Sequence, residues 1–479
     1  MATAKKAAPA AKKAGVADQA APTYTKEQLV KAKTLNLPRD AVAAVLEDGK
    51  VYTKDQAVSL GSVVKMGTRG IAALPLELNW GPENKVFSIY AEDFNKTALT
   101  VFGYDPTAAD ILLVREALKR ARTLLIYRVN SGGTKATATV GGMTVAAAYG
   151  GTRGNAISVA ILTNADDATN VDVVTYLDGM VMDTQTVAKT SGSANLKAND
   201  FVTFGSAASL EAAVATTLTG GTNGTVNGAA HTAALNGFEV ESFNVIGYPG
   251  DDDTIKALYS TFVKRLRDDE GKKIVGVLYD YKGNNIGLIN VKNGVVLTDG
   301  TTVTGDKAVA WVAGASAGAE INESLTNTAY DDAVDVDIKY TKSQFEAAIQ
   351  AGEFVFYADY GTARVLTDIN SLTDFGGGMT EDWTSNRVIR VLDGWANDVA
   401  RIFGDSYIGK VTNSDTGRQL FKADLVSLAL QYQDIDAISD FVSEDITIAQ
   451  GVGKRDVAVD SALKPNDSME KLYMTVVVN

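Results

Sequence analysis

The sequence predicts a mixed α/β fold of several domains, with an all-β insertion and extended terminal arms. Strand and helix patterns alternate over residues 63–130 and 229–345, whereas a Gly/Thr/Ala/Asn-rich stretch with short alternating runs fills 131–228. The first pattern is typical of a parallel sheet covered by helices, and the second of an all-β unit with many turns. Hydrophobic residues make up 46% of the chain, enough for a globular core.

Two segments precede these domains. Residues 1–23 are mostly Ala and Lys, which predicts a disordered tail. Residues 24–62 are predicted to form a helical extension or arm. Within them, Thr25 to Gln28 and Thr53 to Gln56 fit the capping box, in which a hydroxyl and an amide satisfy free N–H groups at a helix start. The same start recurs at Tyr340 to Gln344.

Residues 63–130 and 229–345 are predicted to form one α/β middle domain. Its strand–helix–strand order after residue 240 implies a parallel pair with a right-handed crossover. The expected strands lie within Arg69 to Leu76, Leu124 to Val129, Phe243 to Tyr248 and Ile274 to Asp280. The expected helices are Ala108 to Ala121, a helix that follows Asp253 and ends near Asp269, and Ala308 to Ile321. The last helix consists largely of small residues, which allow close approach to a neighbour.

The β-rich insertion, residues 131–228, carries alternating runs such as Asn170 to Tyr176, and the turn cluster Leu218 to Gly224 marks its end. Residues 346–479 are predicted to form the C-terminal domain. It should contain strands at Phe354 to Ala358 and Ala363 to Leu366, helices at Asn386 to Phe403 and Arg418 to Tyr432, and strands near Ile446 to Ala449 and Val457 to Val459.

The last ten residues, Glu470 to Asn479, alternate as a β-strand does. Leu472, Met474, Val476 and Val478 share one face, while Tyr473, Thr475 and Val477 share the other. A terminal strand needs a sheet to join, in the same molecule or in a neighbour.

Composition excludes several classes of chemistry. Cys is absent and His231 is the one histidine, so no disulfide, thiol nucleophile or Cys/His zinc site is expected. His231 lies among small residues and is interpreted as an exposed loop residue rather than a catalytic one. No apolar run reaches the length of a membrane span, and the N-terminal lysines lack the apolar core of a secretory signal.

The charge argues against broad binding of phosphates. The net charge is −13, and because residues 1–22 contribute +3, the remainder carries −16. Nucleic-acid affinity comes mainly from neutralising phosphates. Specific nucleic-acid binding is therefore not expected of the body of the chain.

Three candidate sites have simpler interpretations. Asp251, Asp252 and Asp253 could bind a hard cation. We favour the interpretation that they are acids at the start of a helix, where they complement its dipole. Gly404 to Lys410 has the glycines and lysine of a phosphate loop, but Val411 replaces the hydroxyl residue and no strand precedes it. The acids Asp331, Asp332, Asp335 and Asp337 could form a glycosidase pair, although no aromatic cluster surrounds them. We therefore expect no catalytic, cofactor or metal site.

Several stretches resemble the contractile tail sheath proteins of bacteriophages, in the branch found in phages, prophages and phage-tail-like bacteriocins of Gram-positive bacteria. The resemblance spans residues 63–479, and its motifs occur in the family's order. These are Arg69 to Pro82, Gly151 to Asn155, Leu218 to Gly224, Phe262 to Asp268, Glu270 to Lys273, Trp311 to Ala319, Ser324 to Thr326, Asp368 to Thr373, Asn386 to Asp393, Tyr407 to Lys410 and Met469 to Thr475.

The resemblance implies a structural subunit that forms a helical homopolymer of stacked hexameric rings around a tail tube and contracts to drive the tube through a cell envelope. Implied partners are the tube, baseplate and tail terminator proteins, in a virion tail or phage-tail-like particle assembled in the host bacterial cytoplasm. No enzyme activity or membrane insertion is implied. By the same analogy, the C-terminal domain lies near the tube and the 131–228 insertion faces outward.

A terminal strand of one subunit would complete a sheet in the next. The residues assigned to this inter-subunit arm are Lys471, Leu472, Tyr473, Met474, Thr475, Val476, Val477 and Val478. The Pro-Gly-x-Tyr strand that many relatives carry near the N-terminus is absent here. A non-contractile tail protein, a glycan-binding or glycan-cleaving β-rich protein and a regulatory nucleotide-binding protein remain alternatives.

Overall fold

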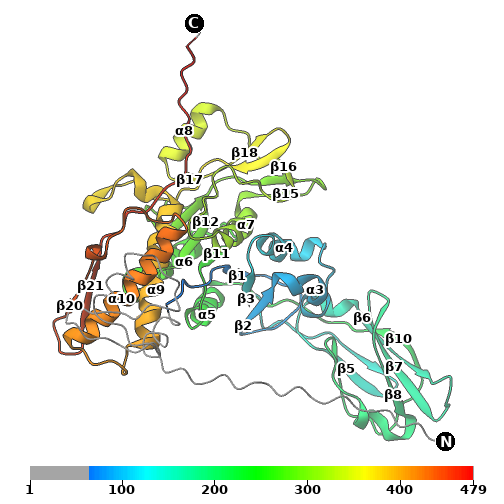
Figure 1. Ribbon diagram of the computed structural model, residues 1–479. Coiled ribbons are helices and arrows are strands. Elements are labelled where there is room, and N and C mark those ends of the chain that lie inside the picture. Colours follow the sequence, from blue (N-terminus) through cyan, green and yellow to red (C-terminus); the bar gives the residue numbers. More distant parts are fainter. Residues whose placement is uncertain (1–63, 478–479) are drawn as a thin grey trace, which may run out of the picture. The chain divides into compact units, whose positions relative to one another are not determined.

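The computed structural model describes residues 64–477 (Figure 1). The predicted tail 1–23 and the capping boxes expected within 24–62 lie outside the described residues. The described chain divides into two compact units, which are considered separately. Residues 67–399, 432–440 and 463–477 belong to the larger unit, and residues 64–66, 400–431 and 441–462 belong to the smaller one.

A seven-stranded sheet forms the centre of the larger unit, in the order β17-β13-β12-β11-β1-β3-β2. All neighbouring pairs are parallel except β2 with β3. The predicted parallel pair, β11 with β12, is thus confirmed. The bounds are β1 Ile71–Leu76, β2 Val86–Tyr90, β3 Thr123–Arg128, β11 Val245–Tyr248, β12 Val275–Tyr279, β13 Leu288–Val291 and β17 Glu353–Phe354.

Helices cover both faces of this sheet because alternate strand residues are apolar on both sides. On one face, Leu74 and Ile126 share a core with helices α3 (Phe94–Phe102), α4 (Leu112–Leu118) and α7 (Gly305–Gly318). On the other, Leu125 and Ile246 pack with α5 (Gly228–Glu239) and α6 (Asp253–Asp268). Figure 1 shows α7 beside the central strands.

The β-rich insertion consists of two antiparallel sheets around a separate apolar core. The strands are β4 Thr137–Val140, β5 Met143–Ala147, β6 Ile157–Thr163, β7 Asn170–Leu177, β8 Met180–Ala188, β9 Val202–Phe204 and β10 Ala213–Thr217. The order is β10-β6-β7-β8 in one sheet and β4-β5-β9 in the other. The predicted fold class, mixed α/β and multidomain with an all-β insertion, is confirmed.

Smaller elements flank the central sheet. They are β14 Val295–Leu297, β15 Thr302–Val303, β16 Ala333–Val336, α8 Lys342–Gln350, β18 Phe356–Asp359 and β19 Thr362–Val365. The predicted helix start is confirmed at α8, where the side chains of Thr341 and Gln344 form the capping box. The predicted strand Phe354 to Ala358 is divided at Val355, since β17 joins the central sheet and β18 pairs with β19.

Two long helices and a hairpin follow. Helix α9 spans Asn386–Ser406 and α10 spans Asp415–Asp434, while β20 (Ile446–Gln450) pairs antiparallel with β21 (Val457–Ser461). These elements match the predicted order. Within residues 64–477, no helix is long and apolar enough to cross a membrane.

His231 is the clearest correction to the sequence interpretation. It lies in α5 and is only 4% exposed, rather than in an exposed loop. Its Nδ1 atom lies 3.2 Å from the hydroxyl of Tyr259, and its ring packs edge-on against Tyr248 and Tyr259. The surrounding small residues are helix residues that let His231 reach this aromatic cluster.

Candidate functional site

The C-terminal segment of the chain is held to the larger unit up to Glu470. Pro465 forms a bridge with Ile438, and the N–H of Asn466 donates to the carbonyl of Ala437 at 2.9 Å. The hydroxyl of Ser385 then donates to Asp467 at 3.0 Å. These contacts fix the path of the chain as it approaches the arm.

The last anchors are polar side chains at the start of α9 and after α7. Arg387 donates to the hydroxyl of Ser468 at 2.9 Å, and the hydroxyl of Thr326 donates to Glu470 at 2.6 Å. Thr326 in turn accepts the N–H of the buried Asp368 at 2.8 Å. The arm is therefore attached to a buried polar network rather than to a surface loop.

Asp368 is the centre of that network and is 2% exposed. Its carboxylate accepts from the N–H of Leu325 at 3.0 Å, from the amide of Asn386 at 2.8 Å and from Arg390 at 3.3 Å. A buried carboxylate needs such donors to offset its loss of hydration. Four of the resembling stretches, around residues 324–326, 368–373, 386–393 and 469–475, thus meet at one place.

After Glu470 the chain leaves this support. Among the described residues, 471–477 form no hydrogen bond or ion pair and belong to no strand. Figure 1 shows the stretch, in dark red, as a chain without an arrow. The large apolar side chains are exposed: Leu472 86%, Tyr473 90%, Met474 75%, Val476 71% and Val477 76%. Val478 lies outside the described residues.

The structure assigns the other candidate groups to structural contacts. Asp252 caps α6 by accepting the N–H of Ile255 at 3.0 Å, and Asp251 and Asp253 pair with Lys256. These contacts agree with acids at a helix start. Among residues 64–477, no group of three or more His, Asp or Glu side chains is arranged to hold a metal ion.

The remaining acids and the phosphate-loop-like stretch are also accounted for. Asp331 accepts from Arg120 at 2.7 Å and from Trp311 at 2.9 Å, and Asp337 accepts the N–H of Gly294 at 2.7 Å. Gly404 lies inside α9, so a helix and not a strand precedes Lys410. A phosphate loop follows a strand, so the stretch Gly404 to Lys410 does not have the context of one.

The alternating pattern predicts a strand over Glu470 to Asn479, but residues 471–477 form none within a single copy of the chain. The sequence pattern also did not predict the anchors Thr326, Ser385 and Arg387. Their polar side chains carry no periodic signal. The order of the resembling stretches was the available clue, since the anchors lie in or beside two of them, Ser324 to Thr326 and Asn386 to Asp393.

Comparison with known proteins agrees with this architecture. Four family models match consecutive parts of the chain: the tail sheath protein Gp18 domain III N-terminal region (69–129), the phage tail sheath protein β-sandwich domain (131–223), its central domain (224–371) and the phage tail sheath C-terminal domain (379–479). The solved sheath tail protein of Desulfitobacterium hafniense is 46% identical, with a TM-score of 0.78, over 86% of this chain and 97% of that one.

The chain belongs to the phage tail sheath protein family. The solved sheath tail protein of Listeria innocua is similar as well, at 35% identity and a TM-score of 0.75, over 88% of this sheath protein and 97% of that chain. The phage-like element PBSX protein XkdK of Bacillus subtilis (strain 168) is 38% identical over 445 residues, 87% of this chain and 94% of that protein. The predicted family and its Gram-positive branch are thereby confirmed.

More distant structures share the fold alone. The helical sheath of the anti-feeding prophage in its contracted state has a TM-score of 0.53 at 11% identity, over 87% of this sheath protein and 95% of that chain.

Proposed function

We propose that this chain is the subunit of a contractile tail sheath, polymerising as a helix of stacked hexameric rings around a tail tube. The observation that carries the proposal is the arm, whose apolar side chains are exposed after Glu470. A sheet of a neighbouring copy would bury them by strand addition. A head-to-tail contact of this kind that does not close generates a helical polymer.

The hairpin β20–β21 is the acceptor we propose for the arm of a neighbour. In the described part of the chain, no further strand pairs with its outer edges. An isolated two-stranded hairpin is marginally stable in water, and added strands would complete the sheet. Backbone hydrogen bonds along an open edge would supply the affinity.

The energetics favour an arm that stays attached during shortening. Burial of each large apolar side chain contributes about 1.5–3 kcal/mol, whereas an exposed ion pair contributes about 0–1 kcal/mol. Polar contacts between subunits can therefore rearrange while the arms hold. A difference of ~1–3 kcal/mol per subunit, the usual size of a coupling, adds up along a polymer, so shortening needs no nucleotide.

The proposed partners are a second copy of the chain, the tail tube, and the baseplate and tail terminator proteins. The C-terminal domain with its arm would lie near the tube and the β-sandwich would face outward. The proposed location is the tail of a virion or phage-tail-like particle, assembled in the host bacterial cytoplasm. Shortening of the sheath would drive the tube through the target envelope.

The test compares the full chain with a variant that lacks residues 471–479. The cut keeps the anchor Glu470. Electron microscopy should show long striated tubes of the full chain, and the truncated chain should remain folded but form none. A variant that carries a Gly/Ser segment of equal length in place of 471–479 should also fail, because length alone does not supply apolar burial.

Two results would contradict this proposal. Normal tubes from the truncated chain would reject the arm as the linkage. Full-length tubes that never shorten would favour a non-contractile tail protein.

A further inference from the structure

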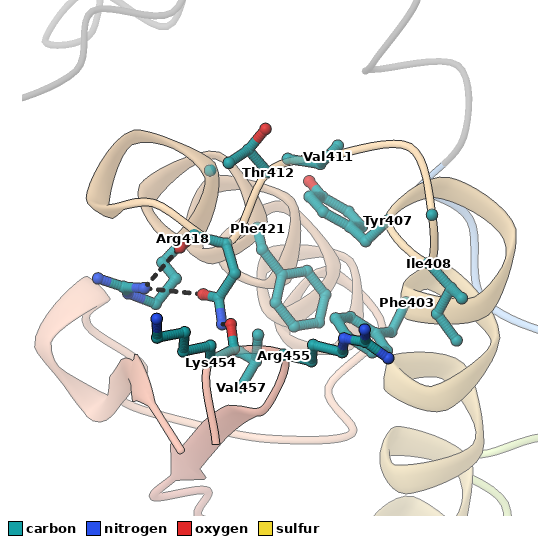
Figure 2. Close-up of a pocket in the computed structure, with 13 residues that line it drawn as sticks. Phe403, Tyr407, Ile408, Val411, Thr412, Arg418, Phe421, Lys454, Arg455 and Val457 are labelled. Carbon is teal, nitrogen blue, oxygen red and sulfur yellow. Dashed lines mark hydrogen bonds between the residues drawn. The ribbon is translucent and has the colours of Figure 1, made fainter. Parts of the chain in front are cut away.

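An apolar pocket of about 500 Å³ lies within the smaller unit. Its walls come from the end of α9, the loop that follows, the start of α10 and the start of β21. Figure 2 shows the rings of Tyr407 and Phe421 beside this space. Its size and apolar lining are those of a typical binding cavity. The apolar lining residues are Phe403, Tyr407, Ile408, Val411, Phe421 and Val457.

Hydrogen bonds hold the walls of this pocket in place. The hydroxyl of Tyr407 donates to Asp424 in α10. The amide of Asn413 donates to the carbonyl oxygens of Lys454 at 3.1 Å and Asp456 at 2.9 Å. The guanidinium of Arg418 donates to the side-chain oxygen of Asn413 at 2.7 Å (Figure 2). The loop is thus tied to both the helix and the hairpin turn, so the cavity is formed before any partner arrives.

The pocket adjoins the open edge of β21. Val457 is both the first residue of β21 and a wall of the pocket, whereas no residue of β20 lines it. Val457, Val459 and Ser461 share one half-buried face of the hairpin, with the buried Ile446 opposite Ser461. A strand added along β21 would continue this face, because side chains alternate between the two faces of a sheet.

We infer that this pocket receives the row Leu472, Met474 and Val476 from the arm of a second copy, when that arm pairs with the free edge of β21. The inference rests on the proposed function and specifies its contact. In strand addition, backbone bonds give affinity and pockets for alternate side chains give register.

The choice of row follows from chemistry. Leu472, Met474 and Val476 carry no hydroxyl, whereas the opposite row contains the hydroxyls of Tyr473 and Thr475. Thr412, Asn413, Arg418, Lys454 and Arg455 line part of the pocket, but its aromatic and aliphatic walls offer a hydroxyl no partner. A buried hydroxyl without a partner is costly. Methionine sulfur also makes favourable contacts with aromatic rings, which the walls supply.

Peptide binding tests the row. The receptor is the chain truncated after Glu470. Of the residues that this removes, the structure describes 471–477, and these form no hydrogen bond or ion pair with the rest of the chain. A fluorescent peptide of residues 468–479 should bind it saturably. Met474→Asp in the peptide should weaken binding about tenfold or more, equivalent to about 1.4 kcal/mol. The matched peptide with Thr475→Asp should bind within a few-fold of the original.

Substitutions in the receptor test the pocket. Ile408 is 62% exposed and Thr412 is exposed, so substitutions at both positions should leave the fold intact. Ile408→Glu places a negative charge at the entrance of the pocket, and Thr412→Trp fills that entrance with a large side chain. Each substitution should weaken binding of the original peptide about tenfold or more. Val452→Glu, at a fully exposed position of the hairpin turn outside the pocket, is the control and should have no effect.

Three results would overturn the inference. The first is that the substitutions in the pocket leave the affinity for the peptide unchanged. The second is that Thr475→Asp weakens peptide binding whereas Met474→Asp does not. The third is that the truncated chain does not bind the peptide. If the intact monomer excludes a peptide that the truncated chain binds, the arm occupies its own copy, which rejects the second-copy assignment.

Assembly separates this inference from the proposed function. If full-length Ile408→Glu forms normal tubes while the truncated chain forms none, the pocket assignment fails and the sheath proposal stands. If the unmodified full chain forms no tubes, the proposed function itself fails.

Discussion

Buried charged side chains join segments of the larger unit that are far apart in the sequence. Arg267 in α6 makes two hydrogen bonds to Asp393 in α9 and also donates to the carbonyl of Ile274 at 2.7 Å. Both charged side chains are 10% exposed or less. Because each charge compensates the other, removal of one leaves the partner buried and unpaired.

Asp393→Ala should therefore lower the free energy of unfolding by about 3–5 kcal/mol. Urea unfolding followed by circular dichroism measures this value. Asp460→Ala, at an exposed position of β21, is the control and should change it by less than about 0.5 kcal/mol. Equal effects of the two substitutions would show that the Arg267 pair is not a structural link.

His231 predicts a pH dependence. Burial lowers the pKa of its imidazole below the ordinary value of 6.5, and nearby Asp252 opposes this only in part. The folded state therefore favours the neutral ring. As the pH falls below about 6.5, the unfolded chain takes up the proton first, and the folded state loses stability.

His231→Phe removes this titration. Between pH 7.5 and pH 5.5, the unmodified chain should lose stability relative to the variant, by less than about 1.4 kcal/mol per pH unit. Urea unfolding at both pH values measures the difference. Parallel pH dependences of the two proteins would contradict the burial of a neutral His231.

At the scale of elements, small residues decide how closely helices α7 and α4 pack. A methyl group on Gly314 would lie 2.2 Å from the carbonyl oxygen of Ala117, and one on Gly318 would lie 2.0 Å from that of Arg120. Both distances are far inside contact range, so these glycines are required by packing. The predicted role of the small-residue helix, close approach to a neighbour, agrees with this geometry.

Gly314→Ala should destabilise the protein by about 1–3 kcal/mol, because the helices must separate. Gly404 in α9 is the matched control, since a methyl group there meets open space. Gly404→Ala should leave stability unchanged or raise it by up to about 1 kcal/mol. Thermal unfolding of both variants measures the contrast, and an equal loss in both would contradict the packing argument.

At the scale of the whole chain, the β-sandwich is an insertion whose two ends lie side by side. The chain enters it at Asn130 and returns at Gly224, whose N–H donates to the carbonyl of Asn130 at 3.0 Å. Arg153 of the sandwich donates to the carbonyl of Gly103 at 2.6 Å, and Trp80 of the body packs into the sandwich core. The insertion is therefore docked on the body but not threaded through it.

Deletion of residues 131–223, with a short Gly/Ser link, should leave tube assembly largely intact if the sandwich faces outward. Trp80→Ser in the same variant avoids a newly exposed aromatic ring. Electron microscopy of the purified variant measures assembly. Loss of all tubes from a variant that remains folded would reject the outward placement.

The sequence by itself determined the local elements and the apolar alternation of the C-terminal segment. The capping box at Thr341, the long helix from Asn386 and the alternating apolar run after Glu470 all follow from patterns within a few residues. Periodicity and capping depend on near neighbours in the chain, so one sequence suffices to find them.

Only the tertiary structure decided which residues are buried and which meet. It placed His231 against Tyr259, divided the strand at Val355 and brought Thr326, Asp368 and Arg387 together beneath the arm. The hydrogen bonds among these outcomes join residues 28 to 81 positions apart in the chain. Polar side chains carry no periodic trace of such partners. The sequence therefore supplied the apolar run after Glu470, and the fold supplied the polar network that holds its start.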